Sequence, residues 1–253
     1  MSLVRFAGVR KRFGELEALA ECSFEVREGE VFGLLGQNGA GKTTALRILC
    51  GLLAPDAGEV VIDGHDVRAD PLGARRRIAF VPDGAPLYAN LSPRQHLALV
   101  GRLHGLDEAR IASESTRLVE ALELGSRIDD PVGGFSRGMR QKTALACAIL
   151  PRPKLLILDE PLNGLDAPTT AMFKEVLRAW ADRGGAVIYT SHLLDVVERV
   201  CDRMAVLVQG RVAAEGDLEA LRARAGREGT LEQVFAALTH SADPRAQARR
   251  LLG

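Results

Sequence analysis

Short apolar runs alternate with amphipathic stretches along most of the chain. The runs are rich in Val, Ile, Leu and Phe and are bounded by turn residues, which is typical of β-strands. We expect strands at 3–6, 23–27, 31–35, 60–62, 78–81, 155–158, 186–190 and 205–208. The run at 31–35 has no polar residue, as expected of a strand that is buried on both faces. Because helical patterns separate several of these runs, the sequence predicts an α/β fold with a mainly parallel sheet.

The pattern changes to helices between about residues 88 and 150. At its start, Ser92 can cap a helix, Pro93 can take the first helical position and Gln95 can complete a capping box. We expect this stretch to form a helical subdomain that is inserted into the α/β core.

A second capping box, Thr230 to Gln233, begins another apolar helix near the end of the chain. We therefore divide the chain into a main domain at 1–215 and a helical tail at 216–253. The last ten or so residues are expected to be frayed or bound to a partner.

Composition and charge narrow the class of protein. The chain has 253 residues, 47% hydrophobic and 26% charged, which is typical of a globular protein. Its 33 Lys and Arg balance 33 Asp and Glu, so no overall basic field favours nucleic acid. No apolar stretch approaches the ~18 residues that span a bilayer, and the N-terminus lacks a secretory signal pattern. We expect a cytoplasmic protein.

The strongest chemical motif directly follows the apolar run at 31–35. It consists of Gly36, Gln37, Asn38, Gly39, Ala40, Gly41, Lys42, Thr43 and Thr44. This is the G-x-x-x-x-G-K-T pattern of a phosphate-binding loop, in which glycines let backbone amides face an anion at a helix N-terminus. Lys42 is expected to pair with the β and γ phosphates of ATP, and the Thr43 hydroxyl to ligate Mg²⁺. A plain surface turn is a much weaker explanation.

Two carboxylates, Asp159 and Glu160, end the apolar run at 155–158. The carboxyl ends of strands are where ligands bind in open α/β sheets. Asp159 is expected to hold the Mg²⁺ shell, and Glu160 to act on an attacking water as a general base. Alone, the pattern could be a strand that runs into a solvated acidic turn. Together with the phosphate loop, it predicts a P-loop NTPase with a RecA-like core.

A further motif, Phe135-Ser136-Arg137-Gly138-Met139, narrows this class. It resembles the LSGGQ signature of the ATP-binding cassette (ABC) family, in a form similar to that of bacterial exporter ATPases. Ser136 and Gly138 match the signature, whereas Arg137 replaces its first glycine and Met139 its glutamine. Taken alone, this motif is better explained as a helix cap with a flexible neighbour.

Three more positions resemble the family's ordered motifs. Residues 161–166, P-L-N-G-L-D, are similar to its D-loop, and His192 is similar to its switch histidine after a strand. Phe13 matches the aromatic position that stacks on adenine, although a buried core phenylalanine is the alternative. With these motifs, the resemblance covers about residues 3–215 and implies an N-terminal antiparallel β subdomain.

The resemblance implies an ATPase subunit that powers a separate transmembrane permease from the inner face of the cell membrane. It also implies a head-to-tail homodimer in which Ser136 and Gly138 of one subunit complete the ATP site of the other. Lys42, Glu160 and His192 are the implied catalytic residues. The signature form and the tail at 231–235 resemble exporters of the ABC-2 type.

A departure outside the signature is also important. Asp83 stands after the 78–81 strand where the family usually has a glutamine that contacts Mg²⁺ and the permease. Carboxylate oxygen is a good ligand for Mg²⁺, so we expect Asp83 to substitute for the glutamine. The alternative is a plain Asp-Gly turn. The segment from Asp83 to Arg94 is the expected docking surface for the permease.

The main alternative function is that of a soluble ABC ATPase that acts on nucleic acid or ribosomes. Only about 100 residues separate Gly36 from Ser136, which leaves no room for the long coiled coil of repair and chromosome-structure members. Ribosome-associated members usually carry two cassettes in one chain, whereas this chain has a single set of motifs. Its lack of net charge also argues against a nucleic-acid partner. A catalytically inactive cassette is disfavoured because both Glu160 and His192 are present. We therefore expect no nucleic-acid partner.

Overall fold

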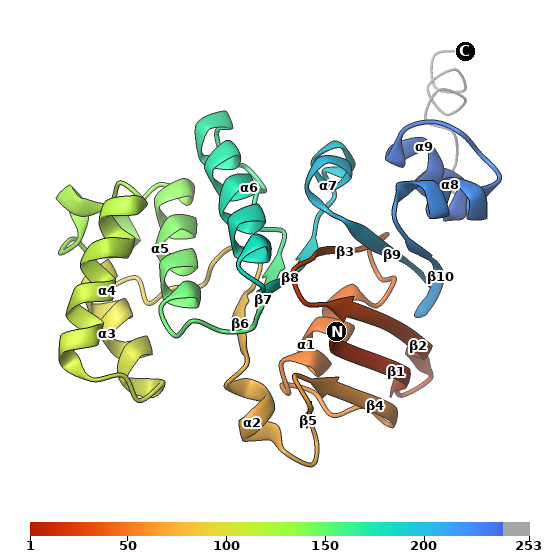
Figure 1. Ribbon diagram of the computed structural model, residues 1–253, viewed down its shortest axis with the longest axis horizontal. Coiled ribbons are helices and arrows are strands. Elements are labelled where there is room, and N and C mark those ends of the chain that lie inside the picture. The colour runs from red at the N-terminus through yellow and green to blue at the C-terminus, as the bar shows by residue number, and fades with distance from the viewer. Residues whose placement is uncertain (240–253) are drawn as a thin grey trace.

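The computed structural model describes residues 1–239, whose strands form two sheets (Figure 1). The strand bounds are β1 Ser2–Phe13, β2 Leu16–Arg27, β3 Val31–Gly36, β4 Ala57–Ile62, β5 His65–Asp66, β6 Ile78–Val81, β7 Leu155–Asp159, β8 Ala186–Thr190, β9 Arg203–Val208 and β10 Arg211–Gly216. One sheet is antiparallel with the order β2-β1-β4-β5. The other has the order β10-β9-β3-β8-β7-β6 and is parallel except for its edge strand β10. The predicted α/β fold with a mainly parallel sheet is confirmed.

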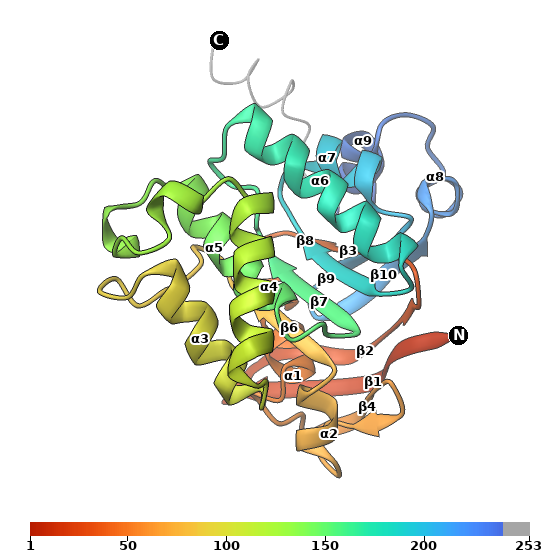
Figure 2. The same cartoon turned by 60° about the vertical axis from the view of Figure 1, so that its left-hand side comes forward.

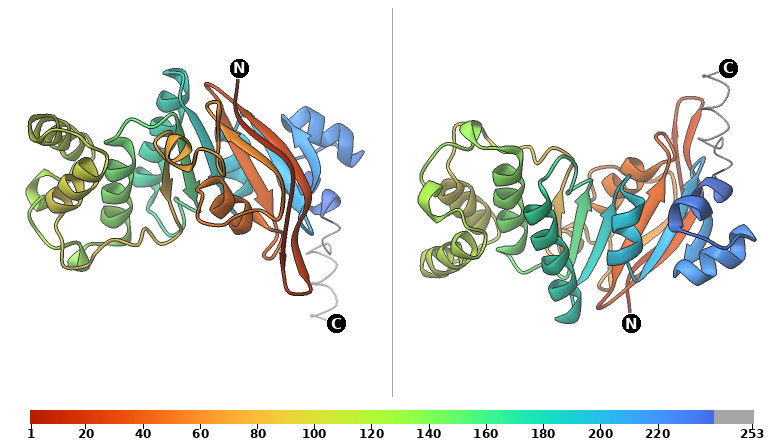
Figure 3. Two further views of the ribbon diagram at one scale, coloured as in Figure 1. Left: turned by 90° about the horizontal axis from the view of Figure 1, so that it is seen from below. Right: turned by 90° about the horizontal axis from the view of Figure 1, so that it is seen from above.

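The helices fall into groups that occupy different parts of the molecule. Their bounds are α1 Lys42–Leu49, α2 Pro71–Arg75, α3 Pro93–Leu103, α4 Glu108–Ala121, α5 Arg137–Ile149, α6 Ala167–Asp182, α7 Leu194–Val200, α8 Leu218–Ala225 and α9 Leu231–Leu238. Helices α3, α4 and α5 gather at the end of the molecule away from the antiparallel sheet (Figures 1 and 3). Helix α6 runs along the parallel sheet beside β8, and α8 and α9 lie near α7 and β10 (Figure 2).

Strand β3 lies between two hydrophobic cores. Val31 and Leu35 belong to a core that includes residues of α5, α6 and α7, whereas Phe32 and Leu34 belong to a core shared with α1 and the antiparallel sheet. Phe32 stacks on Phe24 of β2, with the ring centroids 5.7 Å apart. Both faces of β3 are therefore buried, which explains its uninterrupted apolar sequence.

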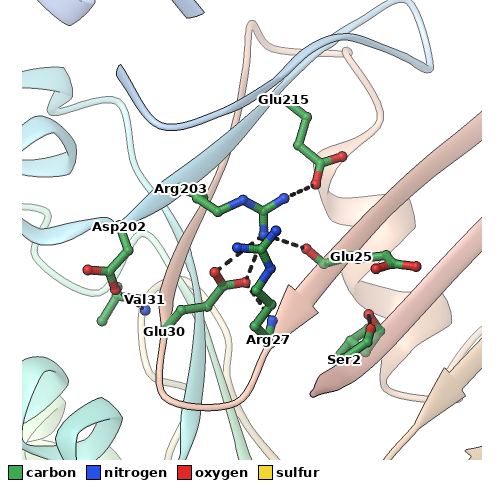
Figure 4. Close-up of polar contacts among 9 residues, drawn as sticks. Ser2, Glu25, Arg27, Glu30, Val31, Asp202, Arg203 and Glu215 are labelled. Atoms are coloured by element: carbon green, nitrogen blue, oxygen red, sulfur yellow. Dashed lines mark hydrogen bonds and ion pairs between the residues drawn. The ribbon is translucent and has the colours of Figure 1, made fainter. Parts of the chain in front are cut away.

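An ionic cluster joins the two sheets near the start of β3 (Figure 4). The guanidinium of Arg203 on β9 donates to Glu30 Oε1 at 3.2 Å, to Glu215 Oε1 at 2.5 Å and to the backbone oxygen of Glu25 at 3.3 Å. The Glu30 side chain is 7% exposed, and its Oε1 also accepts from the backbone N–H of Arg27. Because each charge is paired, the cluster ties the end of β2 to β9 and β10 without leaving an isolated buried ion.

The predicted strands at 3–6 and 23–27 were too short. Each is part of a 12-residue strand of one hairpin. Gly8 has a φ of +59° and the pairing register shifts between Phe6 and Val9, which interrupts the apolar alternation. Beyond this irregularity β1 continues with exposed and half-buried residues at 10–13, which give no hydrophobic periodicity. In β2 the alternation of apolar and polar residues does continue back from Phe24 through Cys22 and Ala20, and the predicted strand at 23–27 stopped short of it.

The predicted helix starts agree with the structure. Ser92 Oγ accepts from the backbone N–H of Gln95, and Gln95 Oε1 accepts from that of Ser92 at 2.9 Å. The expectation for the last residues of the tail falls on 240–253, outside the described part of the chain. No helix within 1–239 has the length and hydrophobicity to cross a bilayer. The domain limits at 88–150 and 215 stay predictions.

Candidate active site

The phosphate-loop pattern forms the turn between β3 and α1, as predicted. Gly39 and Gly41 take left-handed backbone conformations, with φ of +80° and +109°. A Cβ atom at Gly41 would lie 2.6 Å from the backbone oxygen of Ala18 and 2.8 Å from Leu19 Cδ2. Glycine is therefore required here both by conformation and by the close approach of β2.

Lys42 begins α1 and is 8% exposed. Its Nζ donates to the backbone oxygen of Gly36 at 2.5 Å and to that of Gln37 at 3.3 Å. Burial lowers the pKa of Lys42, and the nearby negative charges of Glu160 and Asp159 oppose this shift. The ammonium group is thus held inside the loop and faces the acidic end of β7.

Asp159 and Glu160 are placed by the neighbouring strand β8. The hydroxyl of Thr190 donates to Asp159 Oδ1 at 2.6 Å, and the backbone N–H of Glu160 donates to the Thr190 hydroxyl at 3.1 Å and to its backbone oxygen at 3.2 Å. Thr190 therefore fixes both carboxylate residues through a single side chain. Sequence reasoning passed over it because a threonine at a strand end is common.

Glu160 and His192, which are 32 residues apart, meet at this edge. His192 Nε2 lies 3.1 Å from Glu160 Oε1, and the His192 backbone N–H donates to Glu160 Oε2 at 3.2 Å. Glu160 Oε1 is buried and accepts no aligned hydrogen bond from the described residues. Burial raises the pKa of Glu160, while the charge of a protonated His192 would lower it. A buried carboxylate with a raised pKa and an unused oxygen is suited to accept a proton from water.

Glu160 also has a φ of +48°, which is unusual for a residue with a side chain. Backbone strain of this kind persists only where the surroundings impose it. Here the Glu160 backbone N–H donates to the Thr190 hydroxyl, and the His192 backbone N–H donates to the Glu160 carboxylate. The chain turns sharply after β7. The Asp159 carboxylate therefore contacts Thr190, whereas the Glu160 carboxylate contacts His192.

Phe13 lies beside the phosphate loop and is 48% exposed, which excludes a core-packing role. It lines a cavity of about 260 Å³ with residues of the hairpin and of the loop: Leu16, Ala18, Gln37, Asn38, Gly39, Gly41, Lys42, Thr43 and Thr44. Sequence reasoning missed Leu16 and Ala18, since nothing local distinguishes them. An exposed aromatic ring beside a phosphate loop is a suitable surface for a nucleotide base.

A second cavity of about 350 Å³ lies on the other side of the loop. It is lined by Gly36, Gln37, Asn38, Ser191, His192, Leu194 and Phe235. His192 therefore shares a cavity with the phosphate loop, as its predicted role requires. Phe235 comes from α9 in the tail, and its place at the site could not be deduced from local sequence.

The signature residues lie elsewhere on the same chain. Ser136 caps α5, with its Oγ accepting from the backbone N–H of Met139 at 3.2 Å, and Gly138 packs near Thr169 at the start of α6. Neither Ser136 nor Gly138 lines either cavity. Within one chain the structure does not bring them to the phosphate loop.

Asp83 follows β6 and faces Arg137 of the signature segment. Asp83 Oδ1 and Arg137 Nη2 are 3.7 Å apart, and both side chains are about half exposed. Among residues 1–239, no three His, Cys, Asp or Glu side chains gather in an arrangement that could hold a metal ion. The expected metal role of Asp83 therefore stays a prediction.

A phosphate loop, an adjacent acidic strand end and a buried carboxylate beside a histidine define a P-loop ATPase. The comparisons identify its family. The ABC transporter family model matches residues 19–163. The Nod factor export ATP-binding protein I of Rhizobium sp. (strain N33) is 40% identical over 86% of this chain and 72% of its own length.

Two further comparisons agree. The daunorubicin/doxorubicin resistance ATP-binding protein DrrA of Streptomyces peucetius is 36% identical over 98% of this chain and 74% of its own length. A solved ATP-binding subunit of an ABC transporter has a TM-score of 0.88 and 32% identity, and the match covers 94% of this chain and all of that one. The chain belongs to the ABC transporter family and is an ATP-binding ATPase subunit.

Proposed function

We propose that this chain hydrolyses ATP at the Lys42 and Glu160 site to drive export through a separate transmembrane permease. The observation that carries the proposal is the meeting of Glu160, His192 and the phosphate loop at one edge of the parallel sheet. The similarity to ATP-binding proteins named for Nod factor export and for daunorubicin resistance supports the outward direction. In this proposal the chain works at the cytoplasmic face of the membrane, held there by its permease.

ATP would bind with its base against Phe13 and its phosphates in the loop. Phe13 and Lys42 line the same 260 Å³ cavity, so one ligand can contact both. A phosphate can take over the hydrogen bonds that Lys42 Nζ now gives to backbone oxygens, because a charged acceptor is the stronger partner. Lys42 thus supplies a cation where the γ-phosphate gains charge during hydrolysis.

The residues at the end of β7 suit Mg²⁺, which prefers hard oxygen ligands and retains several waters. Asp159 Oδ1 is held by Thr190, so the carboxylate is oriented and partly exposed, and Thr43 is exposed at the start of α1. When bound, Mg²⁺ would offset the negative charge of the β and γ phosphates. Asp159 and Thr43 would hold it, directly or through water.

Glu160 would accept the proton of the attacking water. Its Oε1 has no aligned hydrogen bond and its pKa is raised by burial, so its basicity is greater than that of an exposed carboxylate. His192 would hold the carboxylate in place through the backbone N–H bond to Oε2 and the contact of Nε2 with Oε1.

The proposal includes a head-to-tail homodimer. Ser136 is exposed and lies away from both cavities of its own chain, so it is free to reach the site of another subunit. Closure of two copies would then place Ser136 and Gly138 of each copy opposite Lys42 of the other. Ser136 caps the start of α5, and backbone N–H groups at a helix N-terminus can bind an anion such as a phosphate.

The segment from Asp83 to Arg94 is the proposed docking surface for the permease. It carries an exposed ring, Tyr88, at 64%. The backbone N–H of Tyr88 donates to His96 Nε2 at 3.0 Å, while His96 Nδ1 is 2.9 Å from the backbone oxygen of Ser92. The buried imidazole therefore fixes the segment on α3, so that the aromatic ring of Tyr88 can stay exposed for a partner.

Phosphate release in the presence of different partners tests this function. Phosphate release by the purified chain is measured under four conditions: alone, with DNA, with ribosomes, and with vesicles that contain its proposed permease, a membrane protein co-expressed with the chain. We expect stimulation by the membrane protein alone. Stimulation by DNA or ribosomes instead would support the soluble ABC ATPase and overturn the proposal, including its lack of a nucleic-acid partner.

A further inference from the structure

Two of the positions that depart from the family pattern, Arg137 and Asp83, lie against one another. Arg137, at the first position of α5, forms an ion pair with Asp83, in the loop after β6. No other Arg or Lys of the described chain forms an ion pair with Asp83 within 4.0 Å. The pair therefore links the signature segment to the segment proposed for docking.

This pair is weak in the structure. The two charged atoms are 3.7 Å apart, which is longer than the ~2.7–2.9 Å of a charged hydrogen bond, and the side chains are 46% and 57% exposed. Ion pairs as exposed as this contribute little to stability because water and salt compete for both partners. A cation at the start of a helix is also disfavoured by the helix dipole. The positive charge of Arg137 is therefore unfavourable at the start of α5, and the weak ion pair with Asp83 compensates for this only in part.

The Arg137 side chain extends across Gly164 of the 161–166 segment. A Cβ atom at Gly164 would lie 3.3 Å from Arg137 Nη1, 3.4 Å from Cδ and 3.5 Å from Cζ. Gly164 has a φ of +66° and no side chain, so no side chain at this position restrains the guanidinium. The geometry allows Arg137 to leave Asp83 without disrupting a packed core.

We propose that Arg137 exchanges partners: it pairs with Asp83 in the separate subunit and binds the γ-phosphate of ATP held by the opposing subunit when two copies close. This inference rests on the proposed head-to-tail dimer, because Arg137 lies between Ser136 and Gly138. A guanidinium binds a phosphate in a two-pronged, charge-assisted manner that an exposed carboxylate at 3.7 Å does not match. Asp83 is then a competitor that holds the separate subunit open.

The exchange predicts opposite effects for the two partners. Removing Arg137 removes a contact of the closed dimer. Replacing Asp83 by Asn removes the ion pair of the separate subunit but keeps a side-chain oxygen for the expected contact with Mg²⁺. A fixed ion pair that merely positions α5 would instead make both substitutions act in the same direction. The sign of the two effects therefore separates the two explanations.

The test uses Glu160→Gln as the parent, so that ATP persists, and measures the dimer dissociation constant by sedimentation at saturating Mg-ATP. We expect Arg137→Ala to weaken the dimer at least tenfold, and Asp83→Asn, which keeps an oxygen ligand, to strengthen it about threefold. The double variant should resemble Arg137→Ala. Arg102→Ala, which breaks another exposed ion pair in the helical region, is the control and should have no effect.

The outcomes are distinct. Weakening by both substitutions, or no effect of Arg137→Ala, would overturn the exchange while the dimer itself stands. A parent that binds ATP but stays monomeric would overturn the proposed dimer and, with it, this inference. Saturation of each variant with ATP is checked by a fluorescent nucleotide titration before sedimentation.

Discussion

Replacement of Glu160 by glutamine should lower the rate of ATP hydrolysis without changing the affinity for ATP. The amide keeps the shape of the side chain but cannot accept the proton of water. The substitution leaves Lys42 and the phosphate loop unchanged, so ATP should bind with nearly wild-type affinity. The Glu160 side chain is 9% exposed and its Oε1 accepts no aligned hydrogen bond, so the amide fits the same place without breaking a hydrogen bond to Oε1.

The expected loss of turnover follows from the role of the base. General base catalysis contributes about 10²–10⁴ in rate, which corresponds to about 2.7–5.5 kcal/mol of activation free energy. Thr190 still holds the backbone of residue 160, so the site should keep its geometry. Hydrolysis should therefore fall by this factor without a comparable change in the dissociation constant for ATP.

Glu160→Gln should lower turnover but raise the thermal stability of the folded chain. Burial raises the pKa of Glu160 in the folded chain, so folding is favoured by the protonated form and this stability is lost as the pH rises through the folded pKa. Glutamine has no charge to desolvate. Glu160→Gln should thus raise Tm at pH 8, and the gain should vanish toward pH 4. A gain of about 1 kcal/mol corresponds to about 2–4 °C.

The assay compares phosphate release, nucleotide titration and thermal unfolding for wild type, Glu160→Gln and the exposed control Glu108→Gln. The control should behave as wild type in all three. Turnover of Glu160→Gln above about a tenth of the wild-type value would refute the base assignment. A Tm that falls at pH 8 would refute the argument from burial.

Three further substitutions test other parts of the site and fold. Thr190→Val keeps size but removes the hydroxyl that holds the acidic strand end, and steady-state kinetics should give a kcat at least about tenfold lower with a smaller change in KM. Gly41→Ala forces a Cβ to within 2.6 Å of the backbone oxygen of Ala18; calorimetry should detect no ATP binding. Arg203→Met leaves the buried carboxylate of Glu30 without its charged partner, and urea denaturation should show a loss of about 3–5 kcal/mol. Wild-type values in any of these measurements would contradict the corresponding contact.

The features that the sequence could predict depend on local patterns. The phosphate loop is recognisable because Gly39 and Gly41 are required by the backbone itself, with φ of +80° and +109°. Strand β7 is recognisable because burial on both faces demands an uninterrupted apolar run. The capped start of α3 follows from Ser92 and Gln95 in the same way.

The features that the sequence could not predict depend on contacts between distant segments. Residues 10–13 of β1 are exposed or half-buried, so this end of the strand has no hydrophobic signal; only its pairing with β2 extends it. Thr190 acquires its role only because β8 pairs with β7. Phe235 reaches the site from α9, about 200 residues after Gly36 in the chain. The pairing of Arg137 with Asp83 likewise joins the start of α5 to the distant loop after β6.

Binding of ATP to the Lys42→Ala variant tests the central claim most directly. Isothermal titration calorimetry with Mg-ATP is run on wild type and on the variant, with circular dichroism to establish that both are folded. Lys42 is the one lysine in the phosphate loop, so we expect a saturable site in the wild type and a loss of affinity of at least about 100-fold in the variant. Near wild-type affinity in a folded Lys42→Ala variant would contradict the assignment of the ATP site.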